Sequence, residues 1–467
     1  MPPYNTAVMS STESIAESAP AEGASGAPSA PRRHLDVRHA MAVCVGMVVG
    51  AGIFRTSPNV AASVMGAGPL FAVWTAGGVL SLIGALCFAE MASAFPHAGG
   101  EYFFLARAYG KNVALLFAWS RFSVIHTGSM ALLAFVFGDY LAQIIHLGPW
   151  SSSIFGVAAI LALTALNLRG VRLGLETQIG FMALVLFGLT CVVAGGIWAA
   201  WHGVASATPM AASASHVDRT AIGTAMVFVL LAYGGWSDAA TLSAEMRDER
   251  RGIVAALALG MAIVLLLYLG ANWGYVRVLG LDGLARSSAP AADLMRRLFG
   301  RPGEWLIVGT VTVAAISVLN ALLIVGARTT YAAACDLAGM DHVGSWDAAR
   351  GTPARAMLAM AAVAIALVGF GSITRSGFST MVDYLTPVYW IFLTLSAVAL
   401  IVLRQRFPDV PRPFRVPGYP VTPAIFILSC LYMVYASLEF VRVGAVVGVV
   451  VLAAGGLWLL PRRRQGG

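Results

Sequence analysis

Two glycine-rich interruptions of apolar sequence are the parts of this chain best suited to bind a ligand through the backbone. The first lies in residues 45–54, which read Val-Gly-Met-Val-Val-Gly-Ala-Gly-Ile-Phe, and the second in residues 232–237, which read Ala-Tyr-Gly-Gly-Trp-Ser. Where a helix unwinds in hydrocarbon, each amide or carbonyl group left without a partner costs several kcal/mol. Breaks of this kind are tolerated where the freed groups line a cavity, so the pair predicts a binding site between two parts of the chain.

The two breaks offer complementary chemistry. A half-helix that begins after Gly50–Gly52 presents free amide N–H groups and a positive dipole end, which suit a carboxylate. Glycine lets a ligand approach this backbone without meeting a Cβ atom. Carbonyl oxygens freed at Tyr233–Gly235 suit an ammonium group, so the two breaks together match an amino acid zwitterion. The alternative is close helix packing, because Gly46 and Gly50 also have small-xxx-small spacing.

The composition is that of a membrane protein. Of 467 residues, 58% are hydrophobic and 11% charged, and the mean hydropathy is +0.79, whereas about a quarter of a soluble chain is charged. The apolar stretches are continuous over about 20 residues, which predicts helices and excludes a β-barrel. The net charge of +8 comes from arginines in loops, so it indicates orientation in a bilayer rather than nucleic-acid binding.

The chain is predicted to cross the membrane twelve times. The expected spans are 39–63, 68–94, 112–144, 152–168, 175–201, 219–243, 252–279, 303–334, 355–373, 379–403, 421–440 and 442–461. A short amphipathic helix outside the membrane is expected at about 283–300. Arginine-rich loops on one side place both termini in the cytoplasm, in a multi-pass protein of the plasma (inner) membrane.

Five segments of the chain are expected to be distinct. They are a disordered cytoplasmic tail (1–37), a first five-helix repeat (38–202), a second five-helix repeat (218–404), a cytoplasmic Pro-rich linker (405–420) and two last helices (421–461). Because five is odd, the second copy enters the membrane from the opposite side, which is an inverted repeat.

No sequence pattern of an enzyme or a metal site is found. The five cysteines lie in or beside apolar spans without metal-ligand spacing. No His/Glu metal motif, no Gly-x-Ser-x-Gly and no phosphate-binding loop occurs. We therefore expect no cofactor, no metal and no enzymatic activity. A sensor or scaffold is the remaining alternative, and the chain lacks the soluble output domain that such a role usually requires.

Five motifs, in order, resemble those of the amino acid–polyamine–organocation transporters. They are residues 46–54, 89–90, 95–102 (Phe-Pro-His-Ala-Gly-Gly-Glu-Tyr), 320–328 and 412–417 (Arg-Pro-Phe-Arg-Val-Pro). Residues 232–246 and 119–140 resemble L-type neutral amino acid exchangers and bacterial serine/threonine exchangers. The resemblance implies an all-α membrane fold of twelve transmembrane helices, with a LeuT-type 5+5 inverted repeat and discontinuous helices 1 and 6.

The resemblance also implies a set of substrate contacts. The matching positions are Val48, Ala51, Gly52, Val124, Ile125, Ser129, Leu231 and Gly234. The chemistry of the two breaks adds Gly50, Tyr233 and Trp236, and the last two either share a gate or pack in the second half-helix. Because the side chains expected around the substrate are uncharged, a neutral substrate is favoured. Relatives often carry an aromatic gate where Leu231 stands here.

Ionisable residues inside spans are treated as functional hypotheses. Glu245 and Arg328 are expected to help close the inward gate. His126 is either a proton site or a packing residue, and Asp238 either pairs with Arg121 or contacts backbone. Glu90 is expected to have a structural role.

These observations predict a secondary transporter, a permease that moves a neutral L-amino acid by alternating access. Exchange, facilitated uptake and proton-linked transport all remain open, although Val185 stands where several relatives carry a proton-binding lysine. The alternative substrate is a polyamine, a cationic amino acid or a related amine. The expected partners are the amino acid and the lipid bilayer, with no nucleic acid. No disulfide-linked accessory subunit is expected, because residues 146–153 hold no cysteine.

Overall fold

The computed structural model describes residues 45, 48–50, 52–95, 100–169, 175–204, 219–239, 252–335, 342–347, 352–374, 376–439 and 443–459. Within these ranges the chain is helical, and the one strand-like pairing is an isolated bridge between Asp347 and Thr352. The helices are α3 (Ile53–Val64), α4 (Ala67–Ala94), α5 (Gly100–Tyr109), α6 (Lys111–Ser120), α7 (His126–Leu141), α8 (Ser151–Leu168), α9 (Leu175–Trp201), α10 (Arg219–Ala232), α11 (Trp236–Ala239), α12 (Gly252–Arg286), α13 (Pro290–Cys335), α14 (Ala354–Ser372), α15 (Gly377–Arg406), α16 (Val421–Glu439) and α17 (Val443–Leu459), with a π-helix η1 (Arg121–Ile125) between α6 and α7.

Most of these helices are long and apolar enough to cross a membrane. Nine stretches in the described part of the chain meet that criterion, one of them running through α6, η1 and α7, and α10 and α17 contain shorter apolar stretches.

Two predicted boundaries coincide with breaks in helical geometry. Gly280 has a φ of 73° inside α12, just after the span expected at 252–279, and Gly300 has a φ of 66° inside α13, just before the span expected at 303–334. The helical stretch at Pro290–Phe299 lies within the region expected to form a short helix.

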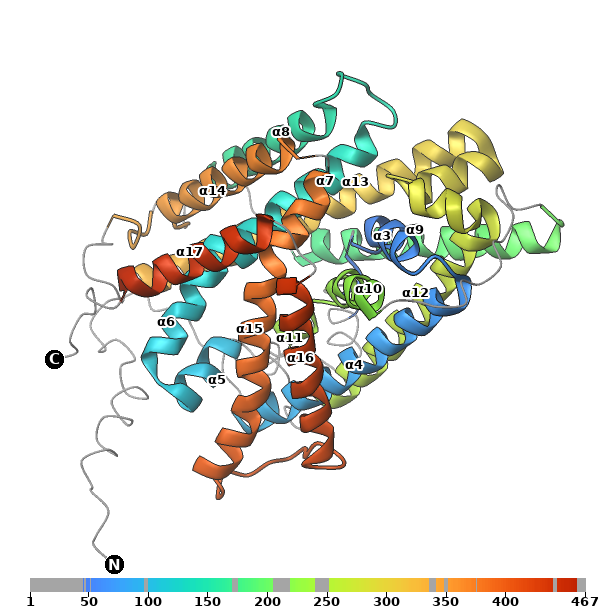
Figure 1. The fold of residues 1–467 in the computed structure, drawn as a ribbon. Coiled ribbons are helices and arrows are strands. Elements are labelled where there is room, and N and C mark those ends of the chain that lie inside the picture. The colour runs from blue at the N-terminus through green and yellow to red at the C-terminus, as the bar shows by residue number, and fades with distance from the viewer. Residues whose placement is uncertain are drawn as a thin grey trace, which may run out of the picture.

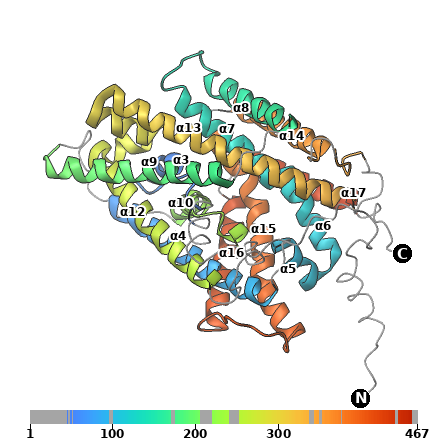
Figure 2. The ribbon, with the colours of Figure 1, turned by 180° about the vertical axis from the view of Figure 1, so that it is seen from behind.

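Helices from the two halves of the chain pack in corresponding pairs. α3 packs against α10, α4 against α12, α7 against α13 and α8 against α14. The pairs α4–α12 and α8–α14 lie side by side in both views, and α3 and α10 lie near the centre of the molecule (Figures 1 and 2). The interrupted segments that precede α3 and follow α10 are therefore brought together in the interior.

A polar layer joins three helices at one end of the bundle. The Nε atom of Arg55 in α3 lies 2.9 Å from Oδ2 of Asp139 in α7. The hydroxyl of Ser152 in α8 donates to the other carboxylate oxygen at 2.7 Å. The guanidinium of Arg55 also lies 5.0 Å from the ring centroid of Phe378, at the start of α15. A cation held by a carboxylate and an aromatic face fixes the start of α3.

A second polar layer lies near the other end of α15, roughly 40 Å away at about 1.5 Å per residue. The carboxylate of Glu90, which is 1% exposed, accepts two hydrogen bonds from Arg404, at 2.6 and 2.5 Å. It also accepts the backbone N–H of Val416 at 2.7 Å. Arg412 donates to the carbonyls of Leu403 and Phe407, which closes the end of α15. These contacts agree with the structural role expected for Glu90.

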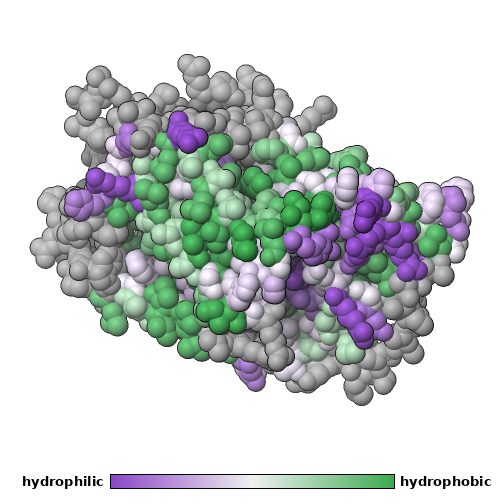
Figure 3. All heavy atoms as spheres, turned by 90° about the horizontal axis from the view of Figure 1, so that it is seen from above, coloured by the Kyte–Doolittle hydropathy of each residue, from purple (hydrophilic) through white to green (hydrophobic). Residues whose placement is uncertain are grey.

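The outer surface is largely apolar. Figure 3 shows one face on which hydrophobic side chains cover the middle and hydrophilic ones gather toward the sides. Large exposed hydrophobic residues are numerous, and they include Trp201 at the end of α9 and Leu266 in α12. A surface of this kind is stable in lipid and would aggregate in water.

The buried ion pair predicts a large stability cost for Arg404→Ala. This change leaves a buried carboxylate without its bidentate partner, and breaking a buried pair costs about 3–5 kcal/mol. We expect a clear decrease in the melting temperature of the detergent-purified protein, measured by fluorescence-detected size-exclusion chromatography. The matched control is Arg301→Ala, because Arg301 is exposed and should contribute less than about 1 kcal/mol. Equal melting temperatures for the two variants would contradict a stabilising role for the pair.

Candidate functional site

The first break lies immediately before α3. The backbone bends at Val49 and Gly50, and α3 begins at Ile53 after Gly52. The N–H of Gly50 reaches back to the carbonyl of Val48 at 2.8 Å in a tight turn, in place of a helical bond. A Cβ atom added at Gly50 would meet no heavy atom within 4 Å, and one added at Gly52 would meet only the Cα of Ala232, at 3.9 Å. Open space therefore lies in front of Gly50, whereas Gly52 faces the backbone of Ala232 at van der Waals distance.

The second break separates α10 from α11. Tyr233, Gly234 and Gly235 form a turn between Ala232 and Trp236. Gly235 has a φ of 99°, a backbone conformation that residues with a Cβ atom rarely adopt. The α-helical hydrogen bond from residue 236 to residue 232 is thereby interrupted, and the carbonyls at the end of α10 need other partners.

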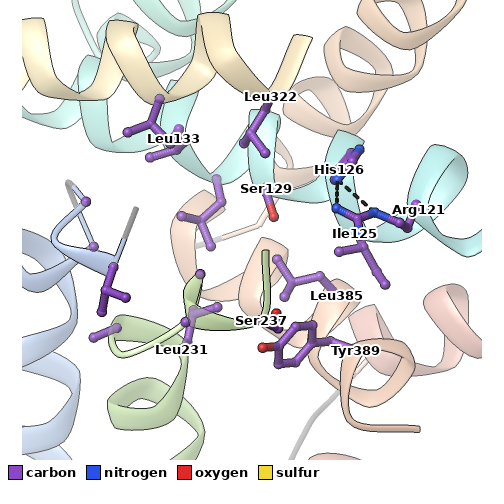
Figure 4. A pocket seen from close by; sticks show the side chains of 18 of the residues that line it. Arg121, Ile125, His126, Ser129, Leu133, Leu231, Ser237, Leu322, Leu385 and Tyr389 are labelled. Carbon is purple, nitrogen blue, oxygen red and sulfur yellow. Dashed lines mark hydrogen bonds between the residues drawn. The ribbon is translucent and has the colours of Figure 1, made fainter. Parts of the chain in front are cut away.

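Both breaks line one cavity of about 220 Å³. The lining residues come from the two breaks and from α3, α5, α6, η1, α7, α10, α11, α13 and α15. They are Val48, Gly50, Gly52, Thr56, Glu101, Phe117, Arg121, Ile125, His126, Ser129, Leu132, Leu133, Leu231, Ala232, Gly234, Gly235, Ser237, Val318, Leu322, Phe378, Leu385, Tyr389 and Phe392. Most of the wall is apolar. Figure 4 shows Leu133 and Leu322 on one side of the cavity, and Leu231 and Leu385 on the opposite side.

Two charged side chains and one histidine lie in this wall. Arg121 begins the π-helix η1, which interrupts a long helix at the cavity, as π-bulges often do at functional sites. Its Nε and Nη2 atoms lie 3.0 and 2.7 Å from Nε2 of His126, as Figure 4 shows. Because a guanidinium can only donate, this nitrogen is the acceptor, which makes His126 a neutral imidazole. The carboxylate of Glu101 accepts the hydroxyl of Ser396 at 2.6 Å.

Eight of the residues singled out from the sequence line the cavity. They are Val48, Gly50, Gly52, Ile125, Ser129, Leu231, Gly234 and His126. The seven predicted substrate contacts among them, all except His126, therefore come from three separate segments that meet in the fold. The backbone of Asp238 lies in α11, while its side chain, Ala51 and Glu245 are outside the described residues.

Four other predicted residues lie away from this cavity. Val124 is fully buried and does not line it. Tyr233 points its hydroxyl toward the carbonyl of Trp74, and Trp236 packs edge-on against Phe88. Arg328 is exposed on α13. The rings of Tyr233 and Trp236 pack between helices, and their share in a gate stays a prediction.

Several cavity residues were missed by the sequence analysis. Glu101 was noted only as part of a motif, and no residue of α13 or α15 was proposed as a substrate contact. Val318, Leu322 and Leu385 lie in helices whose sequence is apolar on all sides, so periodicity gave no signal of the face that meets the cavity. Among the described residues, no group of three or more His, Cys, Asp or Glu side chains is arranged to hold a metal ion.

The known proteins that this chain resembles include amino acid permeases and transporters. A family model described as amino acid permease matches residues 35–459. The chain is 28% identical to mouse b(0,+)-type amino acid transporter 1 over 400 residues, which cover 85% of this chain and 80% of the relative. It is 24% identical to the human cystine/glutamate transporter, covering 91% and 84%. It is 26% identical to human large neutral amino acids transporter small subunit 2, covering 94% and 82%.

The cavity predicts a difference in chemical access between two neighbouring positions. In a variant whose native cysteines are replaced by serine, Ser129→Cys should react with a small water-soluble methanethiosulfonate reagent at least about tenfold faster than Val124→Cys, because thiol reactivity requires access. The reaction is measured by mass spectrometry of the purified protein. Similar labelling at both positions would show that the cavity boundary is misplaced.

Proposed function

The chain belongs to the amino acid permease family, and from this premise we propose that it moves a neutral L-amino acid across the membrane by alternating access. Membership makes it an integral, multi-pass amino acid transporter, and a family of permeases agrees with the expectation that it is not an enzyme. The observation that carries the proposal is the meeting of both helix breaks in one cavity with a mainly apolar wall.

The substrate head group is proposed to bind to the main chain. The N–H groups of Arg55 and Thr56 donate to the carbonyl of Gly52. The N–H groups that precede them, at the start of α3, are the ones proposed to donate to a carboxylate. The ammonium group is assigned to carbonyl oxygens of the second break, at Leu231 and Ala232. The two breaks lie next to each other, because a Cβ atom added at Gly52 would be 3.9 Å from the Cα atom of Ala232.

The wall favours a substrate with an uncharged side chain. Arg121 and Glu101 carry opposite charges, and His126 is neutral, so the charged side chains of the wall balance. The remaining contacts are mostly aliphatic and aromatic carbon. A net charge on the substrate side chain would lose water without gaining a matched partner, which is costly in such a site.

The architecture that we propose is an inverted repeat within a twelve-span chain. Residues 38–202 and 218–404 form the two repeats, 405–420 the linker, and 421–461 the last two helices. The pairing of α3, α4, α7 and α8 with α10, α12, α13 and α14 supports this division. With both termini in the cytoplasm and the protein in the plasma membrane, rocking of one repeat against the other would expose the cavity to each side in turn.

The coupling mode is proposed as exchange or proton-linked transport. Val185 is 4% exposed in α9, and the lysine found in several relatives is absent from this helix. Of the ionisable groups near the breaks, His126 already accepts hydrogen bonds from Arg121. No covalent accessory subunit is proposed, since residues 146–153 contain no cysteine.

A cationic amino acid, a polyamine or a related amine is the second candidate substrate. One observation favours it, namely that Glu101 lines the cavity. A carboxylate there can attract a cation, although Ser396 occupies one of its oxygens. The two proposals therefore differ in the charge expected on the substrate, which is neutral in the first and cationic in the second.

Uptake and counterflow in proteoliposomes test the function directly. The purified chain is reconstituted and offered labelled neutral, cationic and acidic amino acids and a polyamine, with and without a pH gradient and with amino acid inside or absent. We expect neutral substrates to be carried best. Transport of cations alone, abolished by Glu101→Gln, would support the second candidate, and no transport of any offered amino acid or of the polyamine would refute both.

The main-chain carboxylate site predicts graded effects of side chains at Gly52. This residue has φ −58° and ψ −45°, which any residue can adopt, so a substitution acts through its side chain alone. Gly52→Val should abolish uptake, because its methyl groups enter the space between the breaks, and Gly52→Ala should weaken uptake less. Gly369→Val, on an exposed position of α14, is the control with unchanged uptake. Normal transport by Gly52→Val would place the substrate elsewhere.

A further inference from the structure

One hydroxyl group lies between the two helix breaks. Tyr268 projects from α12 and is fully buried. Its hydroxyl oxygen is 3.1 Å from the carbonyl oxygen of Val48, at the first break, and 3.0 Å from that of Ala232, at the second. The two carbonyls are 184 positions apart in the chain numbering. A single side chain therefore joins the backbone of both interrupted segments.

The two carbonyls hold equivalent places relative to the breaks. In an unbroken helix, Val48 would accept the N–H of Gly52 and Ala232 would accept the N–H of Trp236. Each break begins after one of these carbonyls and so removes its helical donor. Tyr268 gives the carbonyl of Ala232 a donor in place of the helical one, and at Val48 it adds to the 2.8 Å bond from the N–H of Gly50. This matters because an unpaired carbonyl is costly away from water.

The hydroxyl carries one proton for two acceptors. A phenol donates a single hydrogen bond, so the proton is shared between the carbonyls of Val48 and Ala232. Two neighbouring rings restrict its movement toward either carbonyl: Trp74 packs edge-on, with centroids 5.7 Å apart, and Tyr233 packs at a tilt of 42°, with centroids 5.0 Å apart. The shared bond therefore keeps the two breaks at a fixed separation.

We infer that Tyr268 is a positioning residue that sets the distance between the two halves of the substrate site. This inference rests on the proposed function, in which one head group binds to both breaks at once. Tyr268 does not line the cavity, so it acts through the backbone of Val48 and Ala232. Two half-sites held at the right separation bind a small rigid head group without the loss of freedom that a loose pair would require.

The test is Tyr268→Phe, reconstituted in proteoliposomes and compared with the wild type over a range of substrate concentrations. A loss of pre-organisation raises KM, whereas a loss of folded carriers lowers only the maximum rate. We expect KM to rise about five- to tenfold, with the maximum rate per folded carrier within about twofold of the wild type. The folded fraction is measured by size-exclusion chromatography.

Two further variants separate positioning from general stability. Tyr109→Phe removes a comparable phenol-to-carbonyl bond, to Leu395 at 2.8 Å between α5 and α15, and should leave KM unchanged. Replacement of Tyr268 by 4-aminophenylalanine keeps the ring and supplies two N–H donors, one for each carbonyl, and should restore KM. This second variant also serves if Tyr268→Phe does not fold.

The possible outcomes are distinct. A wild-type KM in Tyr268→Phe, or a raised KM in a folded aminophenyl variant, would overturn the positioning role. The same holds if Tyr109→Phe raises KM as much as Tyr268→Phe. A wild-type protein that carries no amino acid would instead refute the proposed function, so failure of the one is distinguishable from failure of the other.

Discussion

The structure depends on one constraint, namely that main-chain N–H and C=O groups away from water must have partners. Two helices give up this pairing at Gly50–Gly52 and at Tyr233–Gly235, in the middle of an apolar bundle. The cost is limited because the two breaks meet. One hydroxyl, from Tyr268, serves a carbonyl of each, and the remaining freed groups face a cavity. The site is thus made of backbone that the fold leaves incompletely paired, which is a suitable receptor for a ligand with one positive and one negative group.

The polar layers at the two ends of the bundle complement this central site. Arg55 with Asp139 ties α3 to α7 at one end, and Glu90 with Arg404 ties α4 to α15 at the other. Both pairs are largely buried and have additional hydrogen-bond partners, which is the condition under which a buried ion pair holds a geometry. Because α3 continues from the first break, its ion pair also fixes the direction in which the amide groups of that break point. Stability at the ends and binding in the middle are therefore linked through the same helix.

Much of the helical architecture could be predicted because hydropathy is a local property. Where the described residues cover the expected spans, those spans overlap observed helices, and two of the expected ends lie beside Gly280 and Gly300, where glycine allows a positive φ that interrupts helical geometry. Both interruptions could also be predicted, from glycines that stand within recognisable motifs. A glycine pair alone is not enough, since Gly77–Gly78 in α4 and Gly195–Gly196 in α9 stay helical. The sequence placed Val48, Ser129 and Leu231 in the site through motif resemblance. It did not distinguish them from Val124, Tyr233 and Trp236, which belong to the same motifs but turn toward neighbouring helices.

The amino-acid sequence by itself determined the class of the protein, the helices and the two places where they break, because these follow from composition and from the conformational freedom of glycine. Only the tertiary structure decided which side chains line the cavity. Leu322, Leu385 and Glu101 reach the cavity because α13, α15 and α5 pack around the breaks, and Arg121 meets His126 because a π-turn rotates the helix between them. A helix that is apolar on every side carries no mark of the face it will turn inward. Packing against helices that are distant in the sequence decides which face turns inward.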